Sequence, residues 1–450
     1  MNNPVIFQKL LTEQWLNTAQ ILSSLSHLTH LVYLKNVNQP VIAFFASEYM
    51  LKQGKVTQNL KRISLYQYQE KSQSINLNHF FNQNIQNHHS DFNGGLIGFV
   101  SYDHAAQQQV SIQQKNQPAL FLGIYRSYLK LTPQGWTFFS DEDEAENIFQ
   151  VIQDAIQYKK PPCFSLTQPC SARWNKNEYV TAFKKVQDYI KAGDCYQINL
   201  TQEFTAKAQG SLLATAEGFW KLTNAPYSGY LKIDDFELLS CSPELFINFE
   251  ANRKIVTRPI KGTMPRYADS KQDEQSKQKL IHSKKDQAEN VMIVDLLRND
   301  LSVYAETGSV KTPQLFEIES FNQVHHMVSE VTATLKEEIN PFDVLMSALP
   351  GGSITGAPKI RAMQIIDELE GAPRGAYCGS MGYFNFDGTG SWNILIRSIQ
   401  KYQDEVSLWA GGGITIASDC DAEYQECFDK VSAMFDLLNT WYKPKEKSES

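Results

Sequence analysis

The sequence predicts an α+β fold, in which runs of adjacent antiparallel strands are interrupted by single helices. The first observation is a series of short segments that alternate apolar and polar residues or are rich in β-forming residues. In the second half of the chain these segments are 195–204, 229–233, 236–240 and 254–260. The second observation is a pair of hairpin turns, Asp234-Asp235 and Asp387-Gly388, which join neighbouring strands. This pattern is not that of a doubly wound sheet.

The first 150 residues or so predict a mixed region of strands and polar connections, with strand-like runs at 31–34, 41–46, 96–102 and 120–125. Residues 73–90 are rich in Asn, Gln and His and are predicted to form a loop or an amphipathic surface helix. A segment with three prolines at 158–169 is the best candidate for a linker. We therefore expect an N-terminal region at 1–157, a linker at 158–172, a larger domain at 173–438 and a C-terminal tail at 439–450.

Helix signals are clearest after the linker. Asn175 and Glu178 form a capping box, and the apolar residues that follow at helical spacing end at Gly193. Two further helices are predicted at 276–297 and 422–441.

Composition and charge restrict the class of protein. Of 450 residues, 42% are hydrophobic and 20% are charged, as expected for a soluble globular protein. The formal charge of −7 is spread without a basic block, which argues against nucleic-acid binding. No stretch approaches the roughly 18 apolar residues of a membrane span. Seven cysteines without a Cys-x-x-Cys pair indicate a reduced, cytoplasmic environment and no structural zinc.

Carboxylates on the predicted helices are candidate metal ligands. Glu289 lies at helical spacing from apolar residues, where an unpaired charge is costly. It is either a metal ligand or catalytic acid, or the partner of Lys285 in an ion pair on the same helix face. Glu423 and Glu426 lie three residues apart and could hold a hard divalent cation such as Mg²⁺, or form a solvated charged face.

Two glycine-rich segments indicate special backbone geometry. Residues 351–359 (GGSITGAPK) lack the lysine position of a Walker A loop and predict a turn into a helix that starts at Pro358. The turn either presents free amide donors to an anion or is a plain tight turn. The triple glycine at 411–413 indicates close approach of another group to the main chain, or a β-bulge.

One lysine and one histidine pair could take part in chemistry. Lys261 lies at a predicted strand end close to Arg258 in sequence. A lysine acts as a nucleophile when its ammonium form is destabilised, although most lysines are merely solvated. His325-His326 precedes apolar residues, and a satisfied structural histidine is the usual outcome.

Taken together, these segments resemble the chorismate-utilising enzymes. The resemblance runs in order through residues 173–436 and rests on AGDCYQINL (192–200), SPELFI (242–247), TRPIKGT (257–263), KDQAENVMIVDLLRND (285–300), VHHMVS (324–329), PGGSITGAPKIRAMQIIDELE (350–370) and AGGGITIASDCDAEYQE (410–426). Anthranilate synthases resemble PIAGT around Lys261, whereas the aminodeoxychorismate synthase branch has PIKGT, as here. The resemblance implies an anthranilate synthase component I-like fold, with antiparallel sheets packed as a sandwich core and helices outside. It also implies a component I region at 1–157 and a chorismate-binding catalytic domain at 173–438.

The reaction implied by the resemblance is amination of chorismate at C4 to 4-amino-4-deoxychorismate, a step toward para-aminobenzoate and folate. The reaction of anthranilate synthase component I is the alternative. Lys261 would attack C2 while the C4 hydroxyl leaves, and ammonia would then enter at C4 and expel the lysine. Glu244 would protonate the departing hydroxyl, and His326 matches an active-site histidine. Because the sequence shows no glutaminase segment, ammonia would come from a glutamine amidotransferase subunit, component II.

The resemblance also implies binding residues. Glu289 and Glu426 match magnesium ligands, with the metal bridging to the ring carboxylate of chorismate. The residues that match substrate contacts are Gly262, Thr263, Tyr377, Arg397, Gly411, Gly412 and Gly413. Related enzymes often hold tryptophan, and Pro226, Tyr227 and Ser228 resemble the second half of that pocket. Residues 36–51 lack a recognisable first half.

Overall fold

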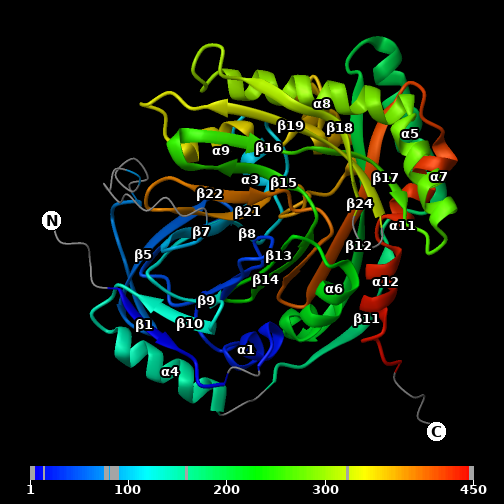
Figure 1. Ribbon diagram of the computed structural model, residues 1–450. Coiled ribbons are helices and arrows are strands. Elements are labelled where there is room, and N and C mark those ends of the chain that lie inside the picture. Colours follow the sequence, from blue (N-terminus) through cyan, green and yellow to red (C-terminus); the bar gives the residue numbers. More distant parts are fainter. Residues whose placement is uncertain are drawn as a thin grey trace, which may run out of the picture.

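The computed structural model describes residues 6–13, 16–75, 81, 91–157, 161–320 and 324–444, and it confirms the predicted α+β class. Two antiparallel sheets of twelve strands each form the framework of the described chain (Figure 1). The first sheet has the order β1 (Phe7–Leu10), β10 (Gly135–Ser140), β9 (Ser127–Thr132), β3 (Val41–Ala43), β2 (Val32–Leu34), β13 (Tyr227–Ile233), β14 (Phe236–Ser242), β23 (Ser398–Tyr402), β24 (Glu405–Thr415), β12 (Gln197–Gly210) and β11 (Phe164–Ala172), with β20 (Gly356–Ala357) paired to β12.

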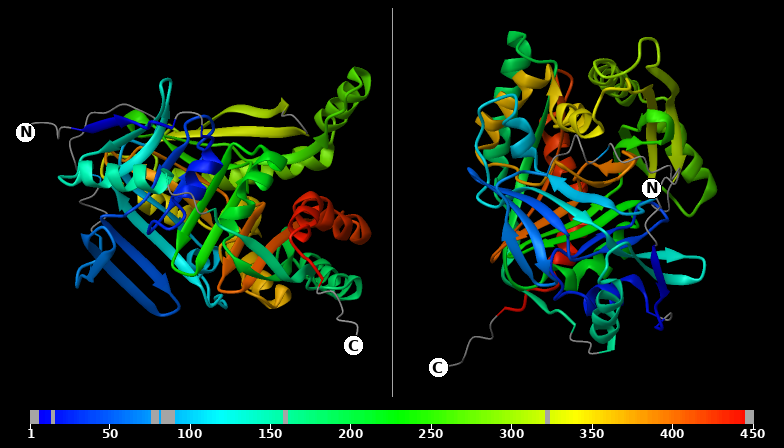
Figure 2. Two further views of the ribbon diagram at one scale, coloured as in Figure 1. Left: turned by 90° about the horizontal axis from the view of Figure 1, so that it is seen from below. Right: turned by 90° about the vertical axis from the view of Figure 1, so that its left-hand side faces the viewer.

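The second sheet has the order β17 (Ile260–Pro265), β19 (Val324–Thr334), β16 (Lys254–Thr257), β15 (Leu245–Phe249), β22 (Gly390–Asn393), β21 (Ser380–Asn385), β7 (Gly95–Val100), β8 (Pro118–Tyr125), β4 (Glu48–Gln53), β5 (Val56–Ser64) and β6 (Gln67–Glu70), with β18 (Lys311–Ser320) paired to β19. Both sheets combine strands from the two ends of the chain. β2 pairs with β13 in the first sheet, and β7 pairs with β21 in the second. In Figure 2, blue and cyan strands accordingly lie in the same sheets as green and orange ones.

The two sheets face each other across an apolar layer. Phe99 of the second sheet stacks on Phe236 of the first, with ring centroids 5.2 Å apart, and Leu231 and Met381 belong to the same buried cluster. Helices cover the opposite faces, because residues that alternate along each strand point away from this layer. The first sheet carries α1 (Thr18–Ser24), α4 (Ala145–Gln157), α6 (Ala216–Thr223) and α12 (Ser432–Asn439). The second carries α3 (Tyr102–Ala106), α8 (Lys284–Ser302) and α9 (Pro341–Ala348).

Three further helices surround β12 and β24, namely α5 (Lys176–Ala192), α10 (Lys359–Glu370) and α11 (Cys420–Asp429). The predicted capping box of α5 is confirmed, since the Asn175 side chain accepts from the Glu178 backbone and the Glu178 side chain accepts from the Asn175 backbone. Gly193 ends the helix in the left-handed conformation, at φ 84°. None of the helices in the described ranges is long and apolar enough to cross a membrane.

Two predicted helices are each divided in the structure. The helix expected at 276–297 is instead α7 (Ser270–Ile281) followed by α8, and the Ser283 side chain caps the second by accepting from the Asp286 backbone. The helix expected at 422–441 is α11 followed by α12, because Val431 leaves the helical conformation and is buried. Helical periodicity continues across both breaks, so the sequence pattern did not show them.

The predicted linker at 158–172 is wrong for residues 164–172, which form β11 at the edge of the first sheet. Phe164, Leu166 and Cys170 are buried there, and two register shifts accommodate the segment around Pro169. The start of the predicted tail packs on this strand, since the Leu166 amide donates to the Trp441 carbonyl. Residues 158–160 of the linker, 445–450 of the tail and most of the predicted loop at 73–90 lie outside the described residues. The division into two domains stays a prediction.

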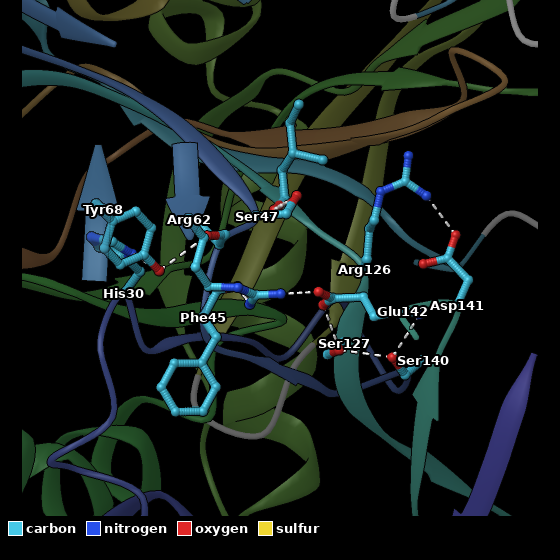
Figure 3. A network of polar contacts seen from close by, with 12 residues as sticks. His30, Phe45, Ser47, Arg62, Tyr68, Arg126, Ser127, Ser140, Asp141 and Glu142 are labelled. Carbon is cyan, nitrogen blue, oxygen red and sulfur yellow. Dashed lines mark hydrogen bonds and ion pairs between the residues drawn. The ribbon is translucent and has the colours of Figure 1, made fainter. Parts of the chain in front are cut away.

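A buried polar network fastens one sheet to the other in the N-terminal region (Figure 3). Arg62 of β5 donates to the Phe45 carbonyl and forms an ion pair with Glu142, which follows β10. Ser127 donates to Glu142 at 2.7 Å and lies 2.8 Å from the hydroxyl of Ser140. Because β5 and β10 belong to different sheets, this network links the two sheets at the end formed by N-terminal strands.

Candidate active site

A lysine and a glutamate meet at a short 3₁₀ turn (Gly352–Ile354) beside the end of the second sheet. Lys261, on β17, donates from Nζ to the Ser353 carbonyl at 3.0 Å. Glu244, between β14 and β15, accepts hydrogen bonds from the Ser353 hydroxyl and the Ile260 amide. Ser353 therefore contacts both predicted catalytic groups, through its carbonyl and its hydroxyl respectively.

Burial dominates the protonation of Glu244. The residue is only 6% exposed, and burial raises the pKa of its carboxyl from 4.5 to about 7, against the opposing effects of Lys261 and the two hydrogen bonds. A carboxyl with this pKa is partly protonated near neutral pH. It can therefore donate a proton, which an ordinary glutamate cannot do efficiently at that pH.

Lys261 is enclosed with charges of both signs. Burial lowers the pKa of its amine, while the nearby carboxylates Glu289 and Glu244 raise it and Lys430 lowers it. The net effect is a pKa below that of an ordinary lysine. A larger share of neutral amine is what a nucleophilic lysine requires.

Two predicted metal ligands approach Lys261 from different helices. Burial raises the pKa of Glu289, on α8, against the effects of Lys261 and Lys285. Burial also favours protonation of Glu426, on α11, but Lys430, Lys285 and Lys261 outweigh it and hold the pKa of this carboxyl below its usual value. The Lys430 amine lies 2.6 Å from the Glu426 carboxylate. Both carboxylates thus belong to one electrostatic cluster with the candidate nucleophile.

Lys285, which was the expected ion-pair partner of Glu289, pairs with Glu423 instead. Lys285 contacts Glu423 at 3.3 Å, and no ion pair of Lys285 with Glu289 occurs in the part of the chain that the structure describes. Glu423 is 2% exposed and also accepts from the Ser418 hydroxyl at 2.7 Å. The solvated-face interpretation is therefore wrong for Glu423. Within the described ranges, no group of three or more His, Cys, Asp or Glu residues is arranged as a ready metal site.

The triple glycine is a site of close approach. A Cβ on Gly411 would lie 2.1 Å from the Leu200 carbonyl, and one on Gly413 would lie 2.0 Å from the Gln197 amide nitrogen. A Cβ on Gly412 would lie 3.0 Å from the Glu423 carboxylate and 3.2 Å from that of Glu426. The register between β12 and β24 is continuous here, so the β-bulge alternative is wrong. At the triple glycine, β24 therefore places backbone without side chains next to the carboxylates of Glu423 and Glu426.

The predicted residues His326, Thr263 and Arg397 also lie near this cluster. His326 Nδ1 is 2.9 Å from the Thr263 hydroxyl. Burial, followed by the charges of Arg397 and His325, lowers the pKa of His326 to about 4, so the ring is neutral at physiological pH. Burial lowers the pKa of Arg397, which lies close enough to Glu244 for their charges to interact. No ion pair to Arg397 is found among the described residues.

Tyr377 and Gly262 occupy the borders of the site. The Tyr377 ring is 6% exposed and stacks on Trp409, two residues before the triple glycine, with centroids 5.8 Å apart. Gly262 has φ 84°, and a Cβ there would lie 2.8 Å from the Asp286 carboxyl carbon. Gly262 thus leaves no space for a side chain directly after Lys261, whereas the contacts of Tyr377 are with Trp409 and with the guanidinium group of Arg374.

Sequence reasoning missed two polar residues of this region. Ser353 lies in the glycine-rich turn, which was considered as a source of amide donors, whereas its acceptor and hydroxyl groups face the catalytic residues. Gln197 is 1% exposed, and neither polar atom of its side chain has a hydrogen-bond partner among the described residues. The sequence did contain a signal for Gln197, because it is a polar residue at a buried position of β12 and lies within the AGDCYQINL segment.

The predicted tryptophan pocket lies elsewhere, between the two sheets. Tyr227 and Ser228 line a cavity with Asn36, Met381 and other residues, and the Pro226 carbonyl accepts from the Val37 amide. The cavity volume is 20 Å³, which suits a water molecule and is far too small for an indole ring. Tryptophan binding stays a prediction.

Comparison with known proteins identifies the class. Residues 36–436 match the family model described as chorismate binding enzyme, and the chain belongs to this family. The crystal structure of anthranilate synthase component I from Streptococcus pneumoniae TIGR4 superposes with a TM-score of 0.74 at 25% sequence identity. That superposition covers 88% of this chain and 92% of the other.

Two individual relatives allow a comparison between two enzymes of this family. The chain is 42% identical over 362 residues to aminodeoxychorismate synthase component 1 from Klebsiella aerogenes, covering 78% of this chain and 79% of the relative. It is 33% identical over 382 residues to anthranilate synthase component 1 from Bacillus subtilis, covering 77% of this chain and 73% of the relative. Of these two relatives, the aminodeoxychorismate synthase component 1 has the higher sequence identity, in agreement with the PIKGT motif.

Proposed function

We propose that this chain aminates chorismate at C4 with ammonia and releases 4-amino-4-deoxychorismate, a precursor of para-aminobenzoate and folate. The 42% identity to aminodeoxychorismate synthase component 1 supports this function. The observation that carries the proposal is the pair formed by Lys261 and Glu244 around Ser353. It puts an amine with a lowered pKa beside a carboxyl with a raised pKa, the combination needed for nucleophilic attack with loss of a hydroxyl group.

The reaction proceeds through two substitutions. The neutral Lys261 amine bonds to C2 of chorismate, the two conjugated ring double bonds shift toward C4, and the C4–O bond breaks. Glu244 gives its proton to the departing oxygen, so that water leaves and not hydroxide. Ammonia then bonds to C4, both double bonds return to their original positions, and the C2–N bond breaks to restore Lys261. The covalent step divides one difficult substitution into two easier ones.

Other residues of the site bind and orient the substrate. Arg397 suits a carboxylate of chorismate, because a guanidinium group can bind it through two parallel hydrogen bonds. By the family resemblance, the backbone of Gly411, Gly412 and Gly413 is the proposed contact of the second anionic group, and Tyr377, Gly262 and Thr263 are proposed to border the ring. His326, neutral and bonded to Thr263, serves as a polar contact and not as a charged one.

Glu289 and Glu426 are the proposed magnesium ligands. Carboxylate oxygens are the donors that Mg²⁺ takes, usually one or two from the protein with water completing the shell. Both carboxylates influence the pKa of Lys261 from separate helices, which supports a shared ion beside this residue. When bound, Mg²⁺ supplies positive charge that offsets the charge of the ring carboxylate. Lys285 and Lys430 provide part of that compensation from the protein.

Ammonia is proposed to come from a partner, a glutamine amidotransferase component II, because the relatives are named component 1. Seven free cysteines support a reducing, cytoplasmic location.

The test is a product assay with the purified chain, chorismate, Mg²⁺ and free ammonia. We expect 4-amino-4-deoxychorismate, with para-aminobenzoate appearing only after a separate lyase is added. Release of anthranilate and pyruvate by the chain alone would contradict the proposal and would support the anthranilate synthase alternative.

A further inference from the structure

A fully buried ion pair lies at the end of α10, away from the proposed reacting groups. Arg374 and Glu370 are each 1% exposed, and Arg374 Nη2 lies 2.7 Å from the Glu370 carboxylate. A second bond joins Arg374 Nε to Glu370 at 2.8 Å. This bidentate geometry is the strongest that the two side chains can form.

The remaining bonds of the pair reach two different segments. Arg374 donates to the Ile354 carbonyl at 2.9 Å and to the Asn199 carbonyl at 2.8 Å. Glu370 accepts from the Thr201 amide at 2.9 Å and from the Thr201 hydroxyl at 2.7 Å. The pair therefore joins the 3₁₀ turn at Gly352–Ile354 to β12. Each bond ends on backbone or on a short side chain, which leaves little freedom of movement.

Ile354, whose carbonyl accepts the hydrogen bond from Arg374, directly follows Ser353 in the chain. Ser353 in turn contacts Lys261 through its carbonyl at 3.0 Å and Glu244 through its hydroxyl. The Arg374 guanidinium also lies over the ring of Tyr377, 5.8 Å from its centroid. One buried arginine is thus linked to the groups proposed to react through two successive residues, Ile354 and Ser353.

Stability alone is a weak explanation for this arrangement. Removing two charges from water costs several kcal/mol, and replacing buried pairs by neutral residues of similar volume is often neutral or stabilising. Reactivity is more sensitive to position, because a displacement of about 1 Å can lower a rate by about 10²-fold. A buried bidentate pair is suited to fixing position.

We propose that the Arg374–Glu370 pair is a positioning element for catalysis, which fixes Ile354 and thereby holds Ser353 against Lys261 and Glu244. This inference rests on the proposed roles of those two residues. Arg374 and Glu370 themselves touch no reacting atom. Their effect on the rate passes through the turn.

The test is the double variant Arg374→Met with Glu370→Gln, compared with the wild type. It removes both buried charges, keeps an acceptor for Thr201, and releases the Ile354 carbonyl from Arg374. We expect a folded protein whose kcat falls at least about tenfold, with KM for chorismate within about twofold of wild type because Arg397 is untouched. Arg361→Met is the matched control on α10, because its ion pair with Asp194 is partly open to solvent and, among the described residues, has no hydrogen bond to the turn; it should leave both constants unchanged.

A second measurement asks whether the effect passes through Ser353. Combined with Ser353→Ala, the double variant should lose less activity than the product of the separate losses, because both changes weaken the contact of the Ser353 hydroxyl with Glu244. Fully multiplicative losses, or a wild-type kcat in the folded double variant, would overturn the inference. If the double variant does not fold, Arg374→Lys replaces it, and the same loss of kcat at unchanged KM is expected.

Rates are measured on whichever product the wild type forms from chorismate. A wild type that forms no 4-amino-4-deoxychorismate contradicts the proposed function, whereas unchanged rates in the variants contradict only the positioning role.

Discussion

Replacing Glu244 by glutamine should make the protein more stable and much less active. The carboxyl is buried, and its pKa of about 7 in the folded protein exceeds the ordinary value of 4.5. Because the folded pKa is raised, this group's contribution to stability is complete below pH 4.5 and is lost as the pH rises through about 7. A rise of this size corresponds to about 3 kcal/mol in the free energy of unfolding.

Glutamine has nearly the same shape and does not ionise, so Glu244→Gln avoids this loss. At pH 8 the variant should be more stable than the wild type by up to about 3 kcal/mol, reduced by its weaker hydrogen bonds to Ser353 and Ile260. At pH 5 the difference should shrink to a small fraction of that value, because the wild-type carboxyl is then protonated in the folded protein. Urea unfolding followed by tryptophan fluorescence at both pH values measures the two differences.

Catalysis should change in the opposite direction. Without a proton for the departing hydroxyl, kcat should fall by about 10²- to 10⁴-fold. In the wild type, activity should decline above pH 7 when the concentration of neutral ammonia is held constant. A variant that is active, or one that is no more stable than the wild type at pH 8, would refute the assignment of Glu244 as a buried general acid.

Three further predictions follow from the site and the fold. Glu426→Gln should raise the Mg²⁺ concentration needed for half-maximal activity, because it removes a proposed ligand, whereas Asp429→Asn on the same helix should not; a magnesium titration that shows no difference would contradict the ligand assignment. Gly411→Ala should destabilise the protein and abolish activity, since its Cβ would lie 2.1 Å from the Leu200 carbonyl; thermal unfolding and turnover measure both effects, and a stable, active variant would show that the backbone can yield. Asn175→Ala should cost about 1 kcal/mol through loss of the α5 cap, measured by urea unfolding, with turnover unchanged.

Local signals were predicted well from the sequence. The cap at Asn175 and the stop at Gly193 depend on residues within one helix, and the structure shows both. The breaks at Ser283 and Val431 were missed because the apolar spacing continues through them. Residues 164–172 were read as a linker because of the neighbouring prolines, although the burial of alternate residues on the edge of a sheet decides their conformation.

The site itself is non-local, which limits what spacing can reveal. Lys261 and Glu289 were each ambiguous as isolated residues, and only the family motifs gave them roles. The structure adds that they lie within electrostatic reach of one another and of Glu244. Ser353 could not be recognised in advance, because its role depends on a turn that meets Lys261 and Glu244, which both lie about 90 residues or more away in the sequence.

The most direct test of the account is mass spectrometry of the enzyme quenched after mixing with chorismate and Mg²⁺ in the absence of ammonia. The account predicts an adduct with the mass of chorismate less one water, located on the peptide that contains Lys261. Addition of ammonia should discharge it, and Lys261→Ala should not form it. Full turnover by Lys261→Ala, with no adduct on the wild type, would contradict the covalent mechanism.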